Sequence, residues 1–199
     1  MAFAWRLRFH ARLVGATIDV DIHPTVRLRG RQHVFLRRGT RTRLEIGPGS
    51  TLDRNVLLYL AGGQLYLGER VRVRSGCVLR VNGGRLQVVG DNILSYNLVI
   101  HCDERVVFGP ESFTGEGVTI GDSEHVRPDD PRTQFQHSIT TAPVEIGART
   151  WLAAKVTVTS GVRVGDDVTV AANAVVATDV PDGSVVGGVP ARPLFPRVD

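Results

Sequence analysis

The chain has 199 residues, 42% of them hydrophobic, so it can bury one substantial core and is expected to fold as a single unit. Its formal net charge of +4 comes almost wholly from arginine. The two cysteines, Cys77 and Cys102, form no C-x-x-C pair and no cluster with histidine, which argues against a structural zinc site and favours a reducing, cytoplasmic setting.

Residues 1–20 are predicted to cap the hydrophobic end of the fold, as an added strand or a short helix. Three arginines, Arg6, Arg8 and Arg12, interrupt the apolar residues of this segment, so we expect neither a signal peptide nor a membrane span. Seven further arginines fall between Arg27 and Arg43. An arginine excess can mark a polyanion-binding surface, but no nucleic-acid motif accompanies the run, so a solvated face and no nucleic-acid partner are predicted.

Residues 21–190 are predicted to form one domain of stacked coils, because hydrophobic residues recur every six positions. Eleven of twelve positions in two series are hydrophobic, whereas the chain average would give about five. The period fits short strands joined by sharp corners, with three hexads to a triangular coil, and fits neither an amphipathic helix nor a hairpin sheet. The two series are Ile146, Leu152, Val158, Val164, Val170 and Val176, and Thr150, Val156, Val162, Val168, Ala174 and Val180.

Glycine-led corners extend the same pattern upstream, less regularly. They follow an aliphatic or aromatic residue at 46–49, 67–69, 89–92, 108–111 and 120–122. Between Asp122 and Pro143 the hexads stop, which predicts a protruding loop with a functional role. Residues 191–199 are predicted to form a short C-terminal tail.

The sequence resembles the hexapeptide-repeat acyltransferases, in particular the galactoside and maltose O-acetyltransferases. The resemblance covers roughly Val88 to Leu194 and is carried by 144–152, 160–167, 179–182 and 188–192. It implies an all-β fold, the left-handed parallel β-helix, assembled as a homotrimer with active sites between subunits. It also implies transfer of an acetyl group from acetyl-CoA, without a metal, to a hydroxyl of a sugar or other small acceptor.

The catalytic base implied by the resemblance is His125, at the start of the interrupting loop. An imidazole can accept the hydroxyl proton as oxygen attacks a thioester and can return it to the departing thiolate. The family's arginine later in the same loop is matched by Arg132, a candidate for binding the acceptor, although Val126 replaces the usual proline after the histidine. A surface-loop histidine without a catalytic role is the competing interpretation.

Further site residues follow from the same resemblance. Acceptor binding is predicted for Ser95, which replaces an asparagine, and for Asn97 and Asp103. Trp151 would cover the pantetheine arm of coenzyme A, although a packing role is equally open. Small side chains would let the pantetheine arm approach the backbone. Arg192, or alternatively Arg197, would replace the family's lysine, which is absent at 177–178. The cofactor-binding set is therefore Trp151, Ala154, Ala172, Ala177 and Arg192.

Several alternatives stay open at this point. The donor could be another acyl-CoA or an acyl-carrier protein, and the acceptor could be an amine. A solenoid scaffold that binds an anionic partner is a non-enzymatic interpretation. A zinc hydratase on the same fold is disfavoured because the spacing of His101, His125 and His137 does not give the close pair of histidines that such a site needs. The identity of the acceptor cannot be predicted.

Overall fold

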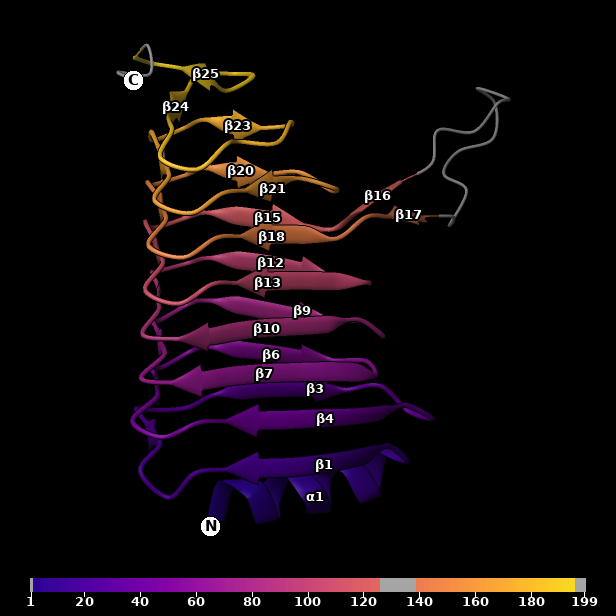
Figure 1. The fold of residues 1–199 in the computed structure, drawn as a ribbon. Coiled ribbons are helices and arrows are strands. Elements are labelled where there is room, and N and C mark those ends of the chain that lie inside the picture. The colour runs from indigo at the N-terminus through magenta and orange to yellow at the C-terminus, as the bar shows by residue number, and fades with distance from the viewer. Residues whose placement is uncertain (1, 126–138, 196–199) are drawn as a thin grey trace, which may run out of the picture.

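A computed structural model describes residues 2–125 and 139–195. One helix, α1 (Ala2–Val14), lies at the N-terminal end of a prism of stacked coils (Figure 1). Three sheets form the sides of the prism, and all their strand pairs are parallel except β24 with β25. This architecture confirms the predicted fold, a left-handed parallel β-helix.

Each coil contributes one strand to each sheet, so neighbours in a sheet are about one coil apart in sequence. Sheet A contains β1 (Thr17–Ile22), β4 (Arg41–Ile46), β7 (Gly63–Glu69), β10 (Arg85–Gly90), β13 (Arg105–Phe108), β18 (Val144–Ile146) and β21 (Arg163–Val164). Sheet B contains β2 (Arg27–Leu28), β5 (Thr51–Leu52), β8 (Arg72–Val73), β11 (Ile93–Leu94), β14 (Phe113–Thr114), β19 (Trp151–Leu152), β22 (Thr169–Val170), β24 (Val185–Gly187) and β25 (Arg192–Pro193). Sheet C contains β3 (His33–Leu36), β6 (Leu57–Leu60), β9 (Val78–Val81), β12 (Val99–Cys102), β15 (Thr119–Gly121), β20 (Thr157–Val158) and β23 (Val175–Val176).

The coils become shorter from the N-terminal to the C-terminal end of the prism. In sheet B, Arg27 pairs with Thr51, and Thr51 pairs with Arg72. Fewer residues separate the second pair than the first, so the second coil is already shorter. Near the other end, Trp151 pairs with Thr169, and the coil is shorter still. The strands of sheet A shorten in parallel, from 7 residues in β7 to 2 in β21. Only the coils that follow the arm therefore have the length of three hexads, and the final step, from Thr169 to Val185, is shorter than that.

The interior of the prism is filled by the side chains that the hexad pattern predicts to face inward. All twelve positions of the two hexad series are buried, none of them more than 6% exposed, which confirms the inward-facing pattern. Upstream, the interior is filled mainly by leucines such as Leu58, Leu65 and Leu79, each at most 1% exposed.

Thr150, the one polar member of the two series, satisfies backbone groups inside a corner. Its hydroxyl donates to the Gly165 carbonyl at 2.8 Å and accepts from the Val168 N–H at 3.3 Å. One coil earlier, Ser112 acts in the same way, donating to the Gly147 carbonyl at 2.6 Å. Buried backbone groups without partners are costly, so a hydroxyl is favoured here over another aliphatic side chain.

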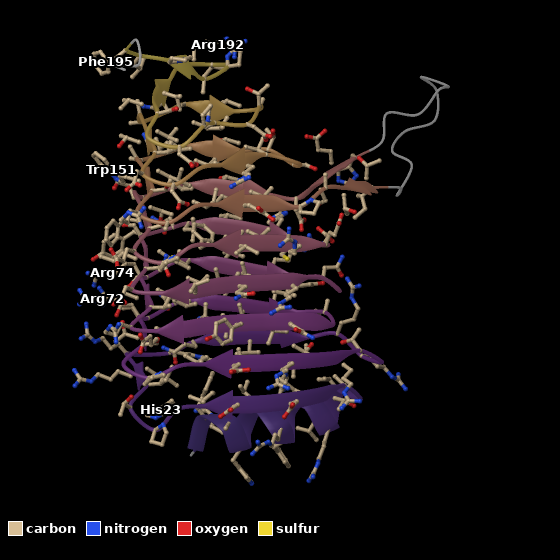
Figure 2. All side chains as sticks on the ribbon, viewed as in Figure 1. His23, Arg72, Arg74, Trp151, Arg192 and Phe195 are labelled. Atoms are coloured by element: carbon tan, nitrogen blue, oxygen red, sulfur yellow. The ribbon has the colours of Figure 1, made fainter. Side chains whose placement is uncertain are left out.

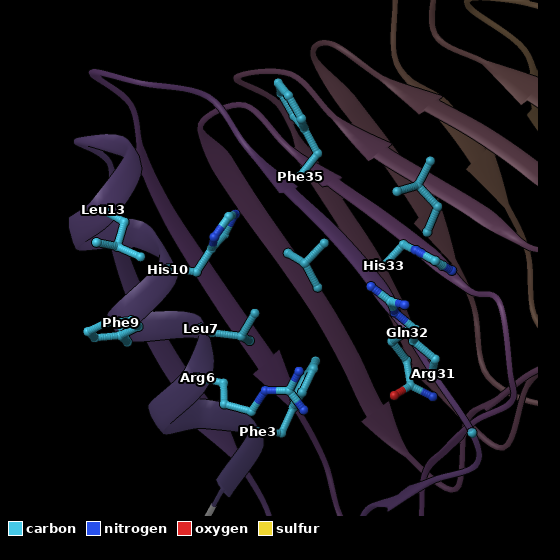
Figure 3. A pocket seen from close by; sticks show the side chains of 13 residues that line it. Phe3, Arg6, Leu7, Phe9, His10, Leu13, Arg31, Gln32, His33 and Phe35 are labelled. Carbon is cyan, nitrogen blue, oxygen red and sulfur yellow. The ribbon is translucent and has the colours of Figure 1, made fainter.

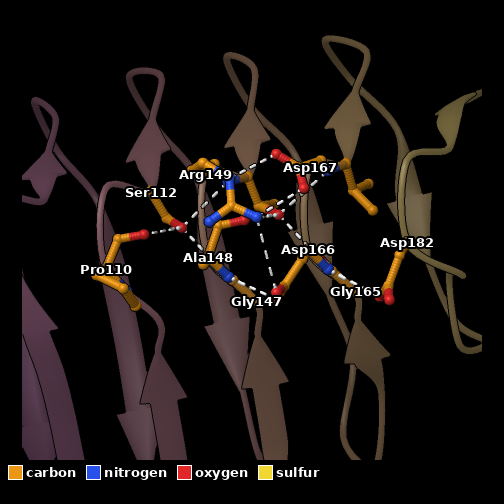
Figure 4. A network of polar contacts seen from close by, with 11 residues as sticks. Pro110, Ser112, Gly147, Ala148, Arg149, Gly165, Asp166, Asp167 and Asp182 are labelled. Atoms are coloured by element: carbon orange, nitrogen blue, oxygen red, sulfur yellow. Dashed lines mark hydrogen bonds and ion pairs between the residues drawn. The ribbon is translucent and has the colours of Figure 1, made fainter.

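The outside of the same corner is held by exposed charged groups (Figure 4). Arg149 donates from Nε and Nη2 to the two carboxylate oxygens of Asp167, at 2.7 Å each. Asp166 accepts from the Ala148 N–H at 2.9 Å, linking two successive coils. Exposed ion pairs of this kind add little to the free energy of folding. Here they hold two successive coils in register.

Replacing Thr150 with valine is expected to lower the free energy of unfolding by about 1–2 kcal/mol, because the buried Gly165 carbonyl loses its partner. Urea unfolding followed by circular dichroism measures the loss. The matched control is Thr157→Val, since within the described residues the Thr157 hydroxyl makes no hydrogen bond. Equal losses in the two variants would contradict the role assigned to Thr150.

The predicted protrusion leaves the prism after β15 and returns before β18 (Figure 1). Its two ends pair as an antiparallel ribbon of β16 (Ser123–His125) and β17 (Ile139–Thr141), so the foot of the arm is regular structure. At the N-terminus, α1 is followed directly by β1. The boundaries proposed at residues 20 and 190 stay predictions.

Candidate active site

His125 lies on the ribbon at the edge where sheet C meets sheet A. β16 and β17 pair through Ser123 with Thr141 and His125 with Ile139. Alternate residues of a strand project to the same face, so His125 projects from the same face as Ser123. The imidazole is exposed, as a group that receives a proton from a bound acceptor needs to be. The structure therefore places the predicted base at the foot of the arm.

Asp122 anchors both ends of this arm. It is fully buried, and its carboxylate oxygens accept from the N–H groups of Asp103 and Glu104 in the coil below, at 2.8 Å each. Its own carbonyl accepts from the N–H of Ala142 at 2.9 Å, where the arm returns, and from the Ser160 hydroxyl at 3.3 Å. One residue thus joins the outgoing strand, the returning strand and two further coils.

Asp103, predicted to bind the acceptor, contacts the same foot. Its side chain is only 4% exposed and accepts from Asn82 Nδ2 at 2.5 Å and from the Ser123 hydroxyl at 2.8 Å. Arg80 Nη1 lies 3.3 Å from it. Burial acts to raise the pKa of this carboxyl, but the hydrogen bonds from Asn82 and Ser123 and the charge of Arg80 outweigh it, so the pKa is lowered. The geometry gives Asp103 a positioning role beneath the arm, and a contact with the acceptor stays a prediction.

His101 belongs to this cluster as well. It lies on β12, paired with Arg80 of β9 below and with Gly121 of β15 above. Burial lowers the pKa of its imidazole, the charge of Arg80 lowers it further, and Asp103 and Asp122 offset this only in part. His101 is therefore held in its neutral form beside the foot of the arm.

The other predicted acceptor residues lie at the opposite edge of sheet C. Ser95 and Asn97 form the corner between β11 and β12, where the Ser95 N–H donates to Thr114 Oγ1 at 2.9 Å and Asn97 has φ = 57°. The four residues of β12 separate this corner from the arm, a span of about 13 Å. Within one chain the structure does not bring Ser95 or Asn97 to His125.

The five predicted cofactor residues are also spread over the prism. Ala154 and Ala172 stack at the corner between sheets B and C, where the Asn173 N–H donates to the Ala154 carbonyl at 2.9 Å. Trp151 begins the strand before that corner and is 53% exposed (Figure 2). Ala177 follows β23, at the other edge of sheet C.

Arg192 lies at the C-terminal end of the prism, together with Phe195 (Figure 2). Both line a cavity of about 880 Å³ that includes Thr178 and Asp179. Arg192 Nη1 donates to the Ala191 carbonyl at 2.8 Å, and the residue is exposed at this cavity. The cavity adjoins Ala177 through Thr178, whereas Trp151 does not line it.

Two predicted residues of the arm, Arg132 and His137, lie outside the described residues, as does Arg197. Sequence reasoning missed Asp122, Ser123 and Asn82 as parts of the site. Asp122 follows glycine as other corner aspartates do, so nothing marked it, and Asn82 is two coils upstream, a separation that no local motif spans. Within residues 2–125 and 139–195 no group of three or more metal-ligating side chains is present. Among these residues, no helix is long and apolar enough to cross a membrane.

Comparison with known proteins gives the family. The family model described as bacterial transferase hexapeptide (six repeats) matches residues 143–178. The chain is 30% identical over 138 residues to WbbJ of Escherichia coli K12, a provisionally assigned lipopolysaccharide biosynthesis O-acetyl transferase, covering 65% of this chain and 70% of WbbJ. It is 26% identical over 110 residues to the galactoside O-acetyltransferase of Escherichia coli K12, covering 55% of this chain but only 53% of that enzyme.

A solved structure shares the fold over most of the chain. The polysialic acid O-acetyltransferase OatWY is similar with a TM-score of 0.62 at 16% identity, over 91% of this chain and 92% of OatWY. Identity this low shows the fold alone. The match to WbbJ, together with the match to the repeat family, establishes that this chain belongs to the hexapeptide-repeat acetyltransferases.

Proposed function

We propose that this enzyme transfers an acetyl group from acetyl-CoA to a hydroxyl of a sugar, with His125 as the general base. The substrate class comes from the relatives: one is named for galactosides and another for lipopolysaccharide biosynthesis. The observation that carries the catalytic assignment is that His125 lies on a ribbon whose foot is tied to the prism by hydrogen bonds that the buried Asp122 accepts.

The reaction requires one proton to move while one bond forms and one breaks. The acceptor oxygen attacks the thioester carbonyl as His125 removes the hydroxyl proton, giving a tetrahedral oxyanion. The C–S bond then breaks, and the imidazolium returns the proton to the leaving thiolate, so the histidine ends in its initial state. General base catalysis of this kind contributes about 10²–10⁴-fold to a rate.

The anchoring of the arm supports this role, because a base is effective only when it is held within hydrogen-bond reach of the proton that it removes. Asp103 fixes Ser123, which projects from the same face of β16 as His125. The lowered pKa of Asp103 keeps this carboxylate ionised at neutral pH, so its hydrogen bonds persist. Asp103 therefore positions the foot of the arm, and acceptor contacts by Asp103 and Arg132 stay predictions.

The separation of the candidate residues supports a homotrimer with intersubunit sites. His125 lies at one edge of sheet C, and Ser95 and Asn97 lie at the other. A site that uses both edges is completed only when a neighbouring prism places its own edge opposite the arm. A small-molecule acceptor would then bind between subunits.

Acetyl-CoA as the donor fits the residues that would border the proposed site between subunits. Ala154 and Ala172 present small side chains at stacked corners, which lets a pantetheine arm approach the backbone. Arg192 offers a guanidinium to phosphates. Asp179, which shares the cavity of Arg192, has its carboxylate engaged by the Arg163 N–H at 2.8 Å. The two free, buried cysteines fit a cytoplasmic enzyme, because such thiols persist in a reducing compartment.

The acceptor class is tested by thiol release from acetyl-CoA with a panel of sugars, aminosugars and hydroxylated small molecules. We expect release that depends on a sugar, with an ester product that hydroxylamine cleaves. A product that resists hydroxylamine would show transfer to an amine and contradict the hydroxyl acceptor. Release with an acyl-carrier protein donor alone would contradict acetyl-CoA as the donor.

A further inference from the structure

The helix α1 carries apolar side chains on two opposite faces. Leu7 and Ala11 face the prism and are 4% and 2% exposed. Trp5, Phe9 and Leu13 are 66%, 51% and 70% exposed, and their i, i+4 spacing aligns them along one outer line of the helix. The Trp5 and Phe9 rings stack with their centroids 5.6 Å apart. We call these three residues the outer ridge.

Positive charge surrounds the outer ridge. The helix contains Arg6, Arg8 and Arg12 and no acidic residue. The Arg8 side chain donates to the Val20 carbonyl at 2.9 Å, whereas the side chains of Arg6 and Arg12 make no hydrogen bond or ion pair with the described residues. Two exposed arginines are thus available beside an exposed apolar line.

The surplus of charge extends through the first coil. Residues 1–43 contain ten arginines and two aspartates, a formal charge of +8, although the entire chain carries only +4. The rest of the protein is therefore acidic on balance. Between Arg27 and Arg43, five exposed arginines make no ion pair within the described part of the chain: Arg27, Arg31, Arg37, Arg38 and Arg41.

A groove runs beside the ridge, between α1 and β3 (Figure 3). Its volume is about 600 Å³, and it combines an apolar floor with cationic walls. The side chains that give it this character are Phe3, Leu13, Phe35 and Leu57, with Arg6 and Arg31. The apolar surface at this end of the prism is thus wider than the ridge itself.

We propose that this end of the enzyme docks on an anionic lipid bilayer. The outer ridge lies at the boundary between headgroups and acyl chains, and the surrounding arginines contact lipid phosphates. Exposed tryptophan, phenylalanine and leucine on a short arginine-rich helix are typical of helices that lie in a membrane interface. With 13 residues α1 is about 20 Å long, so it lies along the surface.

The charge distribution distinguishes a membrane from a second copy of this chain. Two copies that met through α1 would bring two surfaces of high positive charge together, which is unfavourable. A bilayer with anionic lipids instead attracts each exposed arginine by about 1 kcal/mol. The outer ridge and the positive charge around it therefore both favour an anionic bilayer over a second copy of this chain.

Docking at this end leaves the candidate active site free. Sheet C places β15 four strands above β3, which at the usual strand spacing is about 19 Å. The foot of the arm, formed by β16 and β17, leaves from β15 and so lies well clear of a surface that α1 contacts (Figure 1).

Vesicle sedimentation tests this proposal without depending on catalysis. We expect the full chain to bind vesicles of phosphatidylcholine mixed with phosphatidylglycerol at least about tenfold more strongly than phosphatidylcholine alone, and to be released by salt. The double variant Trp5→Ser, Phe9→Ser should lose about tenfold or more of this binding. Acetyl transfer to a soluble acceptor should be unchanged in it.

Matched controls separate the ridge from general surface effects. Phe195→Ser removes an aromatic side chain that is 69% exposed at the opposite end of the prism, and should bind vesicles normally. Arg6→Glu on α1 and Arg72→Glu on sheet B change the net charge by the same amount. Arg72→Glu should weaken vesicle binding less than Arg6→Glu does. In a Trp151→Phe background Trp5 is the only tryptophan, and its fluorescence should shift to shorter wavelength on anionic vesicles.

Equal binding by the wild type and the ridge double variant would overturn the proposal. So would the absence of any preference for anionic vesicles. Self-association that depends on Trp5 and Phe9, without vesicle binding, would identify a second copy as the occupant and likewise overturn it.

Discussion

His125→Ala is expected to lower kcat for acetyl transfer by about 10²–10⁴-fold while leaving KM for acetyl-CoA nearly unchanged. In the proposed mechanism the imidazole acts on the acceptor proton in the transition state, whereas the donor would bind at other residues of the prism. The side chain is exposed on β16, so its removal leaves no cavity in the core. Steady-state kinetics with acetyl-CoA and the best sugar acceptor measure the change.

The matched control for this variant is His23→Ala. His23 is also exposed but lies near the N-terminal end of the prism, where its Nδ1 contacts the Thr25 hydroxyl at 2.9 Å (Figure 2). Its replacement should leave kcat within about twofold. A larger loss of kcat in His101→Ala than in His125→Ala would assign the role of general base to His101, whose lowered pKa favours the neutral imidazole.

Asp122→Ala is expected to lower the free energy of unfolding by about 3 kcal/mol, because the N–H groups of Asp103 and Glu104 lose their acceptors at a buried site. The foot of the arm also loosens, so kcat should fall even though Asp122 contacts no substrate. Urea unfolding and steady-state kinetics on the same preparation measure the two effects.

Asp166→Ala is the comparison for this second variant. Asp166 also follows a corner glycine and accepts from one N–H, but its side chain is 50% exposed. Water can replace the lost acceptor there, so the loss of stability should be smaller and kcat should not change. Full activity in Asp122→Ala would show that the arm needs no anchor at this residue.

The sequence predicted the C-terminal coils well and the N-terminal coils only in outline. From Ile146 to Val176 neighbouring coils are three hexads apart, so hexad counting finds their inward positions. Upstream, longer coils with longer strands break the period, although the same three sheets continue. A strand can lengthen by a pair of residues without changing which face is buried, so coil length varies while the fold is kept.

The candidate site could be predicted only where a local motif marked it. His125 stands at the start of the interruption, and the structure places it at the foot of the arm, while its role as base stays a prediction. The cluster of Asn82, Asp103 and Ser123 joins three coils, and such contacts depend on a stacking register that local patterns do not reveal. At the N-terminus the sequence left strand and helix open; α1 forms there because its inward residues, including Leu7 and Ala11, follow helical spacing.

The most direct test of this account is thiol release from acetyl-CoA by the purified full chain and by His125→Ala, each with and without a sugar acceptor. The account predicts sugar-dependent release in the native protein, matched by O-acetylated product, and at least about a hundredfold less in the variant. Release by the variant at the native rate would contradict His125 as the base, and no release from the native protein with any acceptor would contradict the acetyltransferase itself.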